Sequence, residues 1–155
     1  MAKLKNYSTT VPAMVSVGQI QQILLSFGAK NIMLKADEKR KSVIGISFTY
    51  EVQGKTIPFK LPADIEKVQQ YLYREYMSHT KRPRKTESDF YEEAERVTWR
   101  INKDWIHSSY VSVLETEQVP PLALLMGLMM LDSKTTLYQA VEQGKFPKLL
   151  PAFEG

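Results

Sequence analysis

The chain has 155 residues, of which 43% are hydrophobic and 25% charged, and it contains no cysteine. This composition is typical of one globular domain, and the lack of cysteine excludes disulfides, thiolate metal sites and cysteine nucleophiles. The formal net charge of +4 permits binding to nucleic acid or to another anionic partner without requiring it.

The N-terminal segment predicts a strand followed by a helix. Residues 7–11 are β-branched and aromatic and are closed by Pro12, which is typical of a short strand. Ser16 and Gln19 have the spacing of a capping box, so we expect a helix that begins at Ser16. Gly28 supplies the left-handed residue that commonly ends a helix.

Three further strands are predicted in residues 31–36, 43–52 and 56–61. The middle segment alternates between apolar and small or polar residues, which indicates a sheet with one dry face. Gln53-Gly54 is a favourable tight turn into the last segment. Pro58 cannot donate a ladder hydrogen bond, which places that strand at an edge or at a bulge.

The helical part begins at Asp64 with apolar residues at helical spacing and ends near Thr80. Residues 87–115 then predict one long helix, capped by Thr86 or Ser88, around which the domain is arranged. Two of its faces are apolar: one contains Phe90, Ala94, Val97, Ile101 and Ser108, with Trp105 at its edge, and the opposite one contains Trp99, Ile106, Tyr110 and Val113. We expect both to be buried, one against the sheet and one against the C-terminal helices or a second subunit.

The remaining chain predicts two shorter helices, in residues 122–131 and 135–143, and an irregular tail in residues 145–155. The predicted fold is a single α+β domain over residues 1–155, with a strand, helix, meander and second helix in 1–80 and a helical half in 86–155. It has a small antiparallel sheet of three to four strands, helices on one face and a helical C-terminal half.

Basic residues gather in three places. The loop between the second and the long helix is the densest, a hairpin turn is the second, and a stripe along the long helix, expected to face solvent, is the third. The candidate nucleic-acid-binding residues are Lys39, Arg40, Lys41, Lys81, Arg82, Arg84, Lys85, Arg96, Arg100 and Lys103, with His107 at the end of the stripe. Such groups bind phosphates through counterion release, although solvated loops and helix faces have the same composition.

No motif indicates a reaction, so we expect a protein that is not an enzyme and that holds no metal or cofactor. The two histidines, His79 and His107, lie in different elements and lack zinc-ligand spacing. A nucleophile elbow and a phosphate-cradling glycine loop are both missing. Without a signal-like N-terminus or an apolar run long enough for a membrane, a cytoplasmic location is expected.

Several runs in the sequence resemble a family of small proteins encoded by bacteriophages, prophages and other bacterial mobile elements. The runs are residues 7–11, 18–29, 59–62, 97–105 and 136–138. The family carries no assigned activity, so the resemblance implies only a context. Such a protein works in the bacterial cytoplasm on nucleic acid, or against a component of host defence.

Two functions therefore remain open. The first is a nucleic-acid-binding accessory protein that contacts the phosphate backbone of DNA or RNA. The second is a protein-binding inhibitor or sequestering protein, directed at a host protein or a signalling nucleotide. The second draws on seven Met, eight Tyr and two Trp, which are types enriched at interfaces. A homo-oligomer is compatible with either function.

Overall fold

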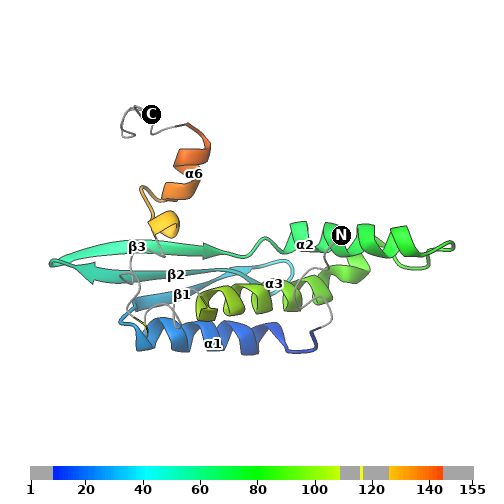
Figure 1. Ribbon diagram of the computed structural model, residues 1–155, viewed down its shortest axis with the longest axis horizontal. Coiled ribbons are helices and arrows are strands. Elements are labelled where there is room, and N and C mark those ends of the chain that lie inside the picture. The colour runs from blue at the N-terminus through cyan, green and yellow to red at the C-terminus, as the bar shows by residue number, and fades with distance from the viewer. Residues whose placement is uncertain (1–8, 109–115, 117–125, 145–155) are drawn as a thin grey trace.

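The computed structural model describes residues 9–108, 116 and 126–144. It confirms the predicted α+β class: a three-stranded antiparallel sheet in the order β1-β2-β3 is combined with helices α1, α2 and α3. Figure 1 shows the sheet at one end, α1 and α3 running beside it, and the α2–α3 helical pair extending away from it. In the C-terminal part, η3 (Met126–Leu128) contacts β3, and α6 (Leu137–Glu142) packs on η3.

The sheet follows the predicted meander through β1 (Lys30–Asp37), β2 (Ser42–Val52) and β3 (Lys55–Pro62). The dry face of β2 is confirmed, since Ile46, Phe48 and Tyr50 are all buried in the core. Gln53 and Gly54 have φ values of 51° and 77°, as a two-residue turn with both central residues left-handed requires. This turn sets the register that pairs Val52 with Lys55.

Pro58 lies on the edge strand β3, as predicted, because that strand pairs on one side with β2. Its outer side contacts the C-terminal segment: the Met130 amide donates to the Pro58 carbonyl at 2.8 Å, and Met129 forms a bridge with Phe59. The predicted strand in residues 7–11 is wrong over its described part, since residues 9–11 form no strand. Residues 7 and 8 lie outside the described part.

Helix α1 (Ala13–Ser26) begins three residues earlier than predicted, with Pro12 at the N-cap and no capping side chain. The Pro12 carbonyl already accepts the amides of Val15 and Ser16. Ser16 is therefore an interior residue, fully buried, and its hydroxyl finds no hydrogen-bond partner among the described residues. The capping-box prediction was wrong because the buried side of the helix extends back to Ala13. Gly28 has a φ of 90°, as expected.

Helix α2 (Ile65–His79) begins where it was predicted, with the Asp64 carboxylate accepting the Lys67 amide. A short loop then leads to the 3₁₀ helix η1 (Glu87–Phe90), which Thr86 and Asp89 cap reciprocally. Helix α3 (Tyr91–Ile106) follows directly. The long helix is thus present from Tyr91 to Ile106 and begins with a 3₁₀ turn, while the predicted continuation through residues 109–115 lies outside the described residues.

The two apolar faces of α3 are buried, as predicted, along most of their described length. At the C-terminal end of the first face Trp105 and Ser108 are exposed, and Tyr110 and Val113 of the second lie outside the described residues. Ala94 and Val97 on one face, and Trp99 and Ile106 on the other, each have 0% exposure. The Trp99 indole donates to the Val43 carbonyl of β2 at 2.9 Å, so this face lies against the sheet. In the described part, α3 packs against α1 and α2, where C-terminal helices or a second subunit had been expected.

The predicted helix over residues 122–131 is wrong where the structure describes it. Residues 126–128 form the 3₁₀ helix η3 (Met126–Leu128), and Met129 and Met130 form bridges. The sequence pattern of an apolar run of this length does not distinguish a helix from a strand. Here backbone contacts with β3 favour an extended conformation at Met129 and Met130. Helix α6 (Leu137–Glu142) confirms the last predicted helix, with Thr136 and Gln139 as a capping box. The tail, residues 145–155, lies outside the described residues.

Candidate nucleic-acid interface

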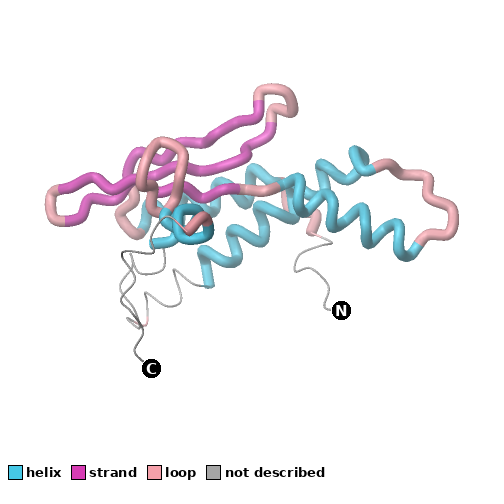
Figure 2. The backbone as a smooth tube through the Cα atoms, turned by 90° about the horizontal axis from the view of Figure 1, so that it is seen from above, coloured by secondary structure: helices cyan, strands magenta, loops and turns pink. Residues whose placement is uncertain are grey.

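The densest basic segment lies at the far end of the molecule, in the loop that joins α2 to η1. Figure 2 shows this loop projecting from the tips of two neighbouring helices. We call residues 81–85 the basic loop; its four cations, Lys81, Arg82, Arg84 and Lys85, are all exposed. Among the described residues, no ion pair is formed by any of them. Residues 81–85 thus carry a charge of +4 that no described residue neutralises through an ion pair.

Side-chain acceptors hold the backbone of the basic loop at its C-terminal end. The Tyr76 hydroxyl of α2 accepts the amides of Arg84 and Lys85, at 2.8 and 3.3 Å. The next amide, that of Thr86, donates to Asp89 at 2.8 Å. Two side chains thus accept three consecutive amides. These hydrogen bonds hold the backbone in one conformation although the loop itself is not buried.

An aromatic cluster beneath the basic loop fixes Tyr76. Phe90 is buried between Tyr73 and Tyr76, with ring centroids 6.1 and 5.3 Å away. The Lys85 ammonium lies 5.5 Å from the centroid of the Phe90 ring, within the range in which a cation is attracted to a ring face. The apolar contacts of η1 with α2 therefore also support the charged loop.

The second basic segment, Lys39, Arg40 and Lys41, forms the exposed turn between β1 and β2. The Asp37 carboxylate accepts the Lys39 amide at 3.0 Å, and the Asp37 carbonyl accepts the Lys41 amide at 2.7 Å. The Arg40 guanidinium lies 4.1 Å from the centroid of the Tyr91 ring. Because Tyr91 follows Phe90, the turn and the basic loop each contact one of two consecutive residues at the start of α3.

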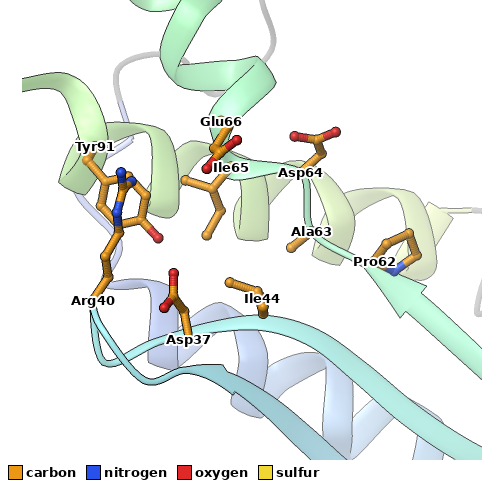
Figure 3. Close-up of a pocket in the computed structure, with 9 residues that line it drawn as sticks. All are labelled: Asp37, Arg40, Ile44, Pro62, Ala63, Asp64, Ile65, Glu66 and Tyr91. Atoms are coloured by element: carbon orange, nitrogen blue, oxygen red, sulfur yellow. The ribbon is translucent and has the colours of Figure 1, made fainter. Parts of the chain in front are cut away.

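A cavity of about 290 Å³ separates the β1–β2 turn from the start of α2. Figure 3 shows the Asp37 carboxylate pointing into the cavity from the strand, with Arg40 over the Tyr91 ring. The hydroxyls of Tyr91 and Ser42 are 2.6 Å apart beside it. The lining contains three carboxylates, from Asp37, Asp64 and Glu66, but the single cation Arg40. Such a cavity disfavours a phosphate or a signalling nucleotide.

The third basic group, Arg96, Arg100 and Lys103, does not form the open solvated stripe that was predicted. All three side chains are partly buried beside α1, because α3 packs on that helix. Arg100 donates to the Gln19 side chain of α1 at 2.8 Å, and Lys103 lies 3.6 Å from Asp104. His107, at the end of the stripe, is exposed.

Acidic residues surround the N-terminal end of this stripe. Glu92 and Glu95 line an open cavity of about 360 Å³ together with Arg96 and Pro12. Burial raises the pKa of the Glu95 carboxyl, and the negative charge of Glu92 raises that pKa further, against the opposing effect of Arg96. Three carboxylates, with Asp104 included, thus balance the three cations of the stripe, which weakens it as a phosphate-binding surface.

The ten candidate residues consequently fall into three separate groups with different charge balance. The basic loop has four cations and no acid, the turn has three cations beside Asp37 and Glu38, and the stripe is balanced. Tyr76, Phe90 and Tyr91 contact the two exposed groups, and their contributions were not predicted from the sequence. In the sequence Tyr76 is one of the residues at helical spacing on the apolar side of its helix, and nothing there signals that its hydroxyl reaches the loop.

Within the described ranges, no group of three or more acidic or histidine side chains is placed to hold a metal ion. None of the described helices combines the length and the apolar character that crossing a membrane requires. Comparison of the chain with protein-family models, with curated proteins and with solved structures finds no match. The resemblance to mobile-element proteins therefore stays a prediction.

Proposed function

We propose that the protein is a nucleic-acid-binding accessory factor that contacts phosphate backbones through the basic loop and catalyses no reaction. The observation that carries this proposal is the arrangement of Lys81, Arg82, Arg84 and Lys85: four exposed cations on an anchored backbone with no neutralising partner among the described residues. Lysine and arginine that are free to release phosphate counterions supply most of sequence-independent affinity.

The β1–β2 turn is the second contact surface in this proposal. Lys39 and Lys41 are exposed there, and Arg40 is held on the Tyr91 ring. Its acidic neighbours, Asp37 and Glu38, reduce its contribution to phosphate binding, so the basic loop is expected to contribute more. The mobile-element resemblance suggests a bacterial host as the setting. DNA and RNA both present the phosphate spacing that such a surface contacts, and the experiment includes both.

The test is a fluorescence-anisotropy titration with labelled single- and double-stranded DNA and RNA at low and moderate salt. We expect binding that is insensitive to sequence and that weakens steeply as salt rises. Changing Arg82 and Arg84 to Gln removes two charges, so the slope of log K against log salt falls by about 1.4–1.8. Lys55→Gln, an exposed change at the distant β2–β3 turn, is the matched control and should leave the slope almost unchanged.

The proposal fails if none of the four nucleic acids binds at low salt. It fails equally if the control lowers the affinity and the salt slope as much as a single loop substitution does, because the binding surface would then lie elsewhere.

A second candidate function, binding to a protein partner, is favoured by one groove between α1 and the end of α3. The groove has a volume of about 470 Å³ and is lined mainly by apolar atoms, from α1 and from Lys103 and His107. Met14 and Val15, which border it, are 56% and 47% exposed. Exposed apolar side chains that cluster are typical of partner surfaces. If the protein acts this way, Met14→Lys abolishes capture of the partner from a host lysate, whereas Arg82→Gln does not.

A further inference from the structure

We infer that Tyr76 is a positioning residue for polyanion binding, because its hydroxyl holds the basic loop in the shape that presents its cations. This inference rests on the proposed function and adds to it a residue that carries no charge. The hydroxyl accepts the amides of Arg84 and Lys85, the two cationic residues nearest η1. A neutral side chain outside the loop thereby fixes the backbone from which two cations extend.

The hydrogen bonds to the Tyr76 hydroxyl restrict the backbone of the basic loop while its side chains stay exposed. The ring of Tyr76 packs at 5.3 Å on Phe90, which is itself 7% exposed, so the hydroxyl extends from a fixed base. Residues 81–85 are all exposed. The amides of Arg84 and Lys85 donate to the Tyr76 hydroxyl, and the amide of the next residue, Thr86, donates to Asp89. Exposed amides are readily solvated, so the two bonds add little to global stability. Their main effect is to restrict the loop.

Restriction of the loop matters for binding because a flexible loop loses conformational entropy when phosphate contacts order it. A loop that is already held in one conformation avoids most of that loss, and its affinity is higher for the same number of charges. The number of phosphates contacted depends on the cations and stays the same. Removal of the Tyr76 hydroxyl should therefore lower the affinity while it preserves the salt dependence, which no loss of a cation can do.

The experiment compares Tyr76→Phe with Tyr73→Phe and Arg84→Gln in the full-length protein. Tyr73 lies on the same helix and contacts the same Phe90 ring. Its hydroxyl forms no hydrogen bond with another described residue, so Tyr73 is the matched control. A labelled single-stranded DNA and a labelled duplex are titrated at several salt concentrations. Amide hydrogen exchange and thermal melting are followed on the same samples.

For Tyr76→Phe we expect affinity about 3- to 10-fold weaker with an unchanged salt slope. For Arg84→Gln we expect a slope lower by about 0.7–0.9, and for Tyr73→Phe no change in either quantity. Exchange of the Arg84 and Lys85 amides should accelerate in Tyr76→Phe. The Thr86 amide, which Asp89 binds, should keep its rate, and the melting temperature should stay close to that of the wild type.

The outcomes separate this inference from the function beneath it. If the wild-type protein binds no nucleic acid, the proposed function fails. If the wild type binds and Tyr76→Phe binds equally well, the function stands and the positioning role is overturned. An affinity loss accompanied by a lower salt slope, or by a matching loss in Tyr73→Phe, also overturns it, because contacts or packing would then explain the loss.

Discussion

Trp99 is the largest of the fully enclosed side chains, and its surroundings explain how α3 is fixed to the sheet. The ring is surrounded by core residues, and its only polar atom donates to the Val43 carbonyl at 2.9 Å. A buried indole needs such a partner, because an unsatisfied donor in the core costs about 1–3 kcal/mol. The hydrogen bond therefore selects one position of α3 along β2.

Truncation of Trp99 should destabilise the protein strongly. We expect Trp99→Ala to lower the free energy of unfolding by about 3–5 kcal/mol, the range for loss of a large core side chain. Trp105→Ala is the matched control, since Trp105 is 41% exposed on the same helix, and should cost about 1 kcal/mol at most. Urea denaturation of both variants gives the measurement. Equal losses in the two variants would contradict the position of Trp99 in the core.

Glu95 gives stability a predictable dependence on pH. Burial and the charge of Glu92 raise the pKa of its carboxyl in the folded state above the ordinary value of 4.5. In the pH range between that ordinary value and the raised pKa, the folded protein therefore binds more protons than the unfolded chain. In that window stability falls as pH rises, and the cost of holding the charged form persists at neutral pH.

The substitution Glu95→Gln should remove this cost. We expect a melting temperature equal to or above that of the wild type at pH 7, and no such advantage below pH 4.5, where the wild-type carboxyl is protonated in both states. Thermal melts across this pH range are the measurement. Glu93→Gln, which removes another carboxylate from the same helix, is the control for the loss of charge alone. A variant that is less stable at pH 7 and equal at low pH would reverse the sign and contradict the burial of Glu95.

At the scale of elements, α3 packs on three neighbours, and its basic stripe is one of the packed sides. Phe90, the N-cap residue of α3, lies between Tyr73 and Tyr76 of α2. Trp99 is turned toward β2, and Arg100 bonds to Gln19 of α1. A helix with two apolar faces was expected to have two packed sides and one wet side. The aliphatic stems of arginine and lysine can cover a neighbouring helix. This explains why the third side of α3, the basic stripe, is packed as well.

Arg100 therefore contributes to the packing of α1 on α3. We expect Arg100→Ala to cost about 0.5–1.5 kcal/mol through loss of the hydrogen bond to Gln19 and of stem packing, which is more than an isolated surface cation would cost. A double-mutant cycle with Gln19→Ala tests the contact, because contacting residues couple by about 0.5 kcal/mol or more. Additive effects of the two substitutions would show that the hydrogen bond has no influence on stability.

At the scale of the whole molecule, folding separates the basic residues according to their charge balance. The basic loop lies at the tip of the α2–α3 pair and the β1–β2 turn at a different place (Figures 1 and 2), while the stripe is covered by α1 and neutralised by carboxylates. The formal charge of +4 is thus distributed unevenly. A partner that is attracted by charge meets the loop first, which is why the proposed binding depends on so few residues.

The sequence by itself determined the class of fold, the three meander strands, the start of α2 and the burial of both apolar faces of α3. These features depend on local patterns, such as alternation along β2, the Gln53-Gly54 turn and helical spacing, which hold in any tertiary context. Only the tertiary structure decided that Ser16 is an interior residue, that Met129 forms a bridge with Phe59 of β3, and that Tyr76 reaches the basic loop. Each of these depends on a contact between segments distant along the chain, or on how far a packed helix extends, and residue spacing carries no information about either.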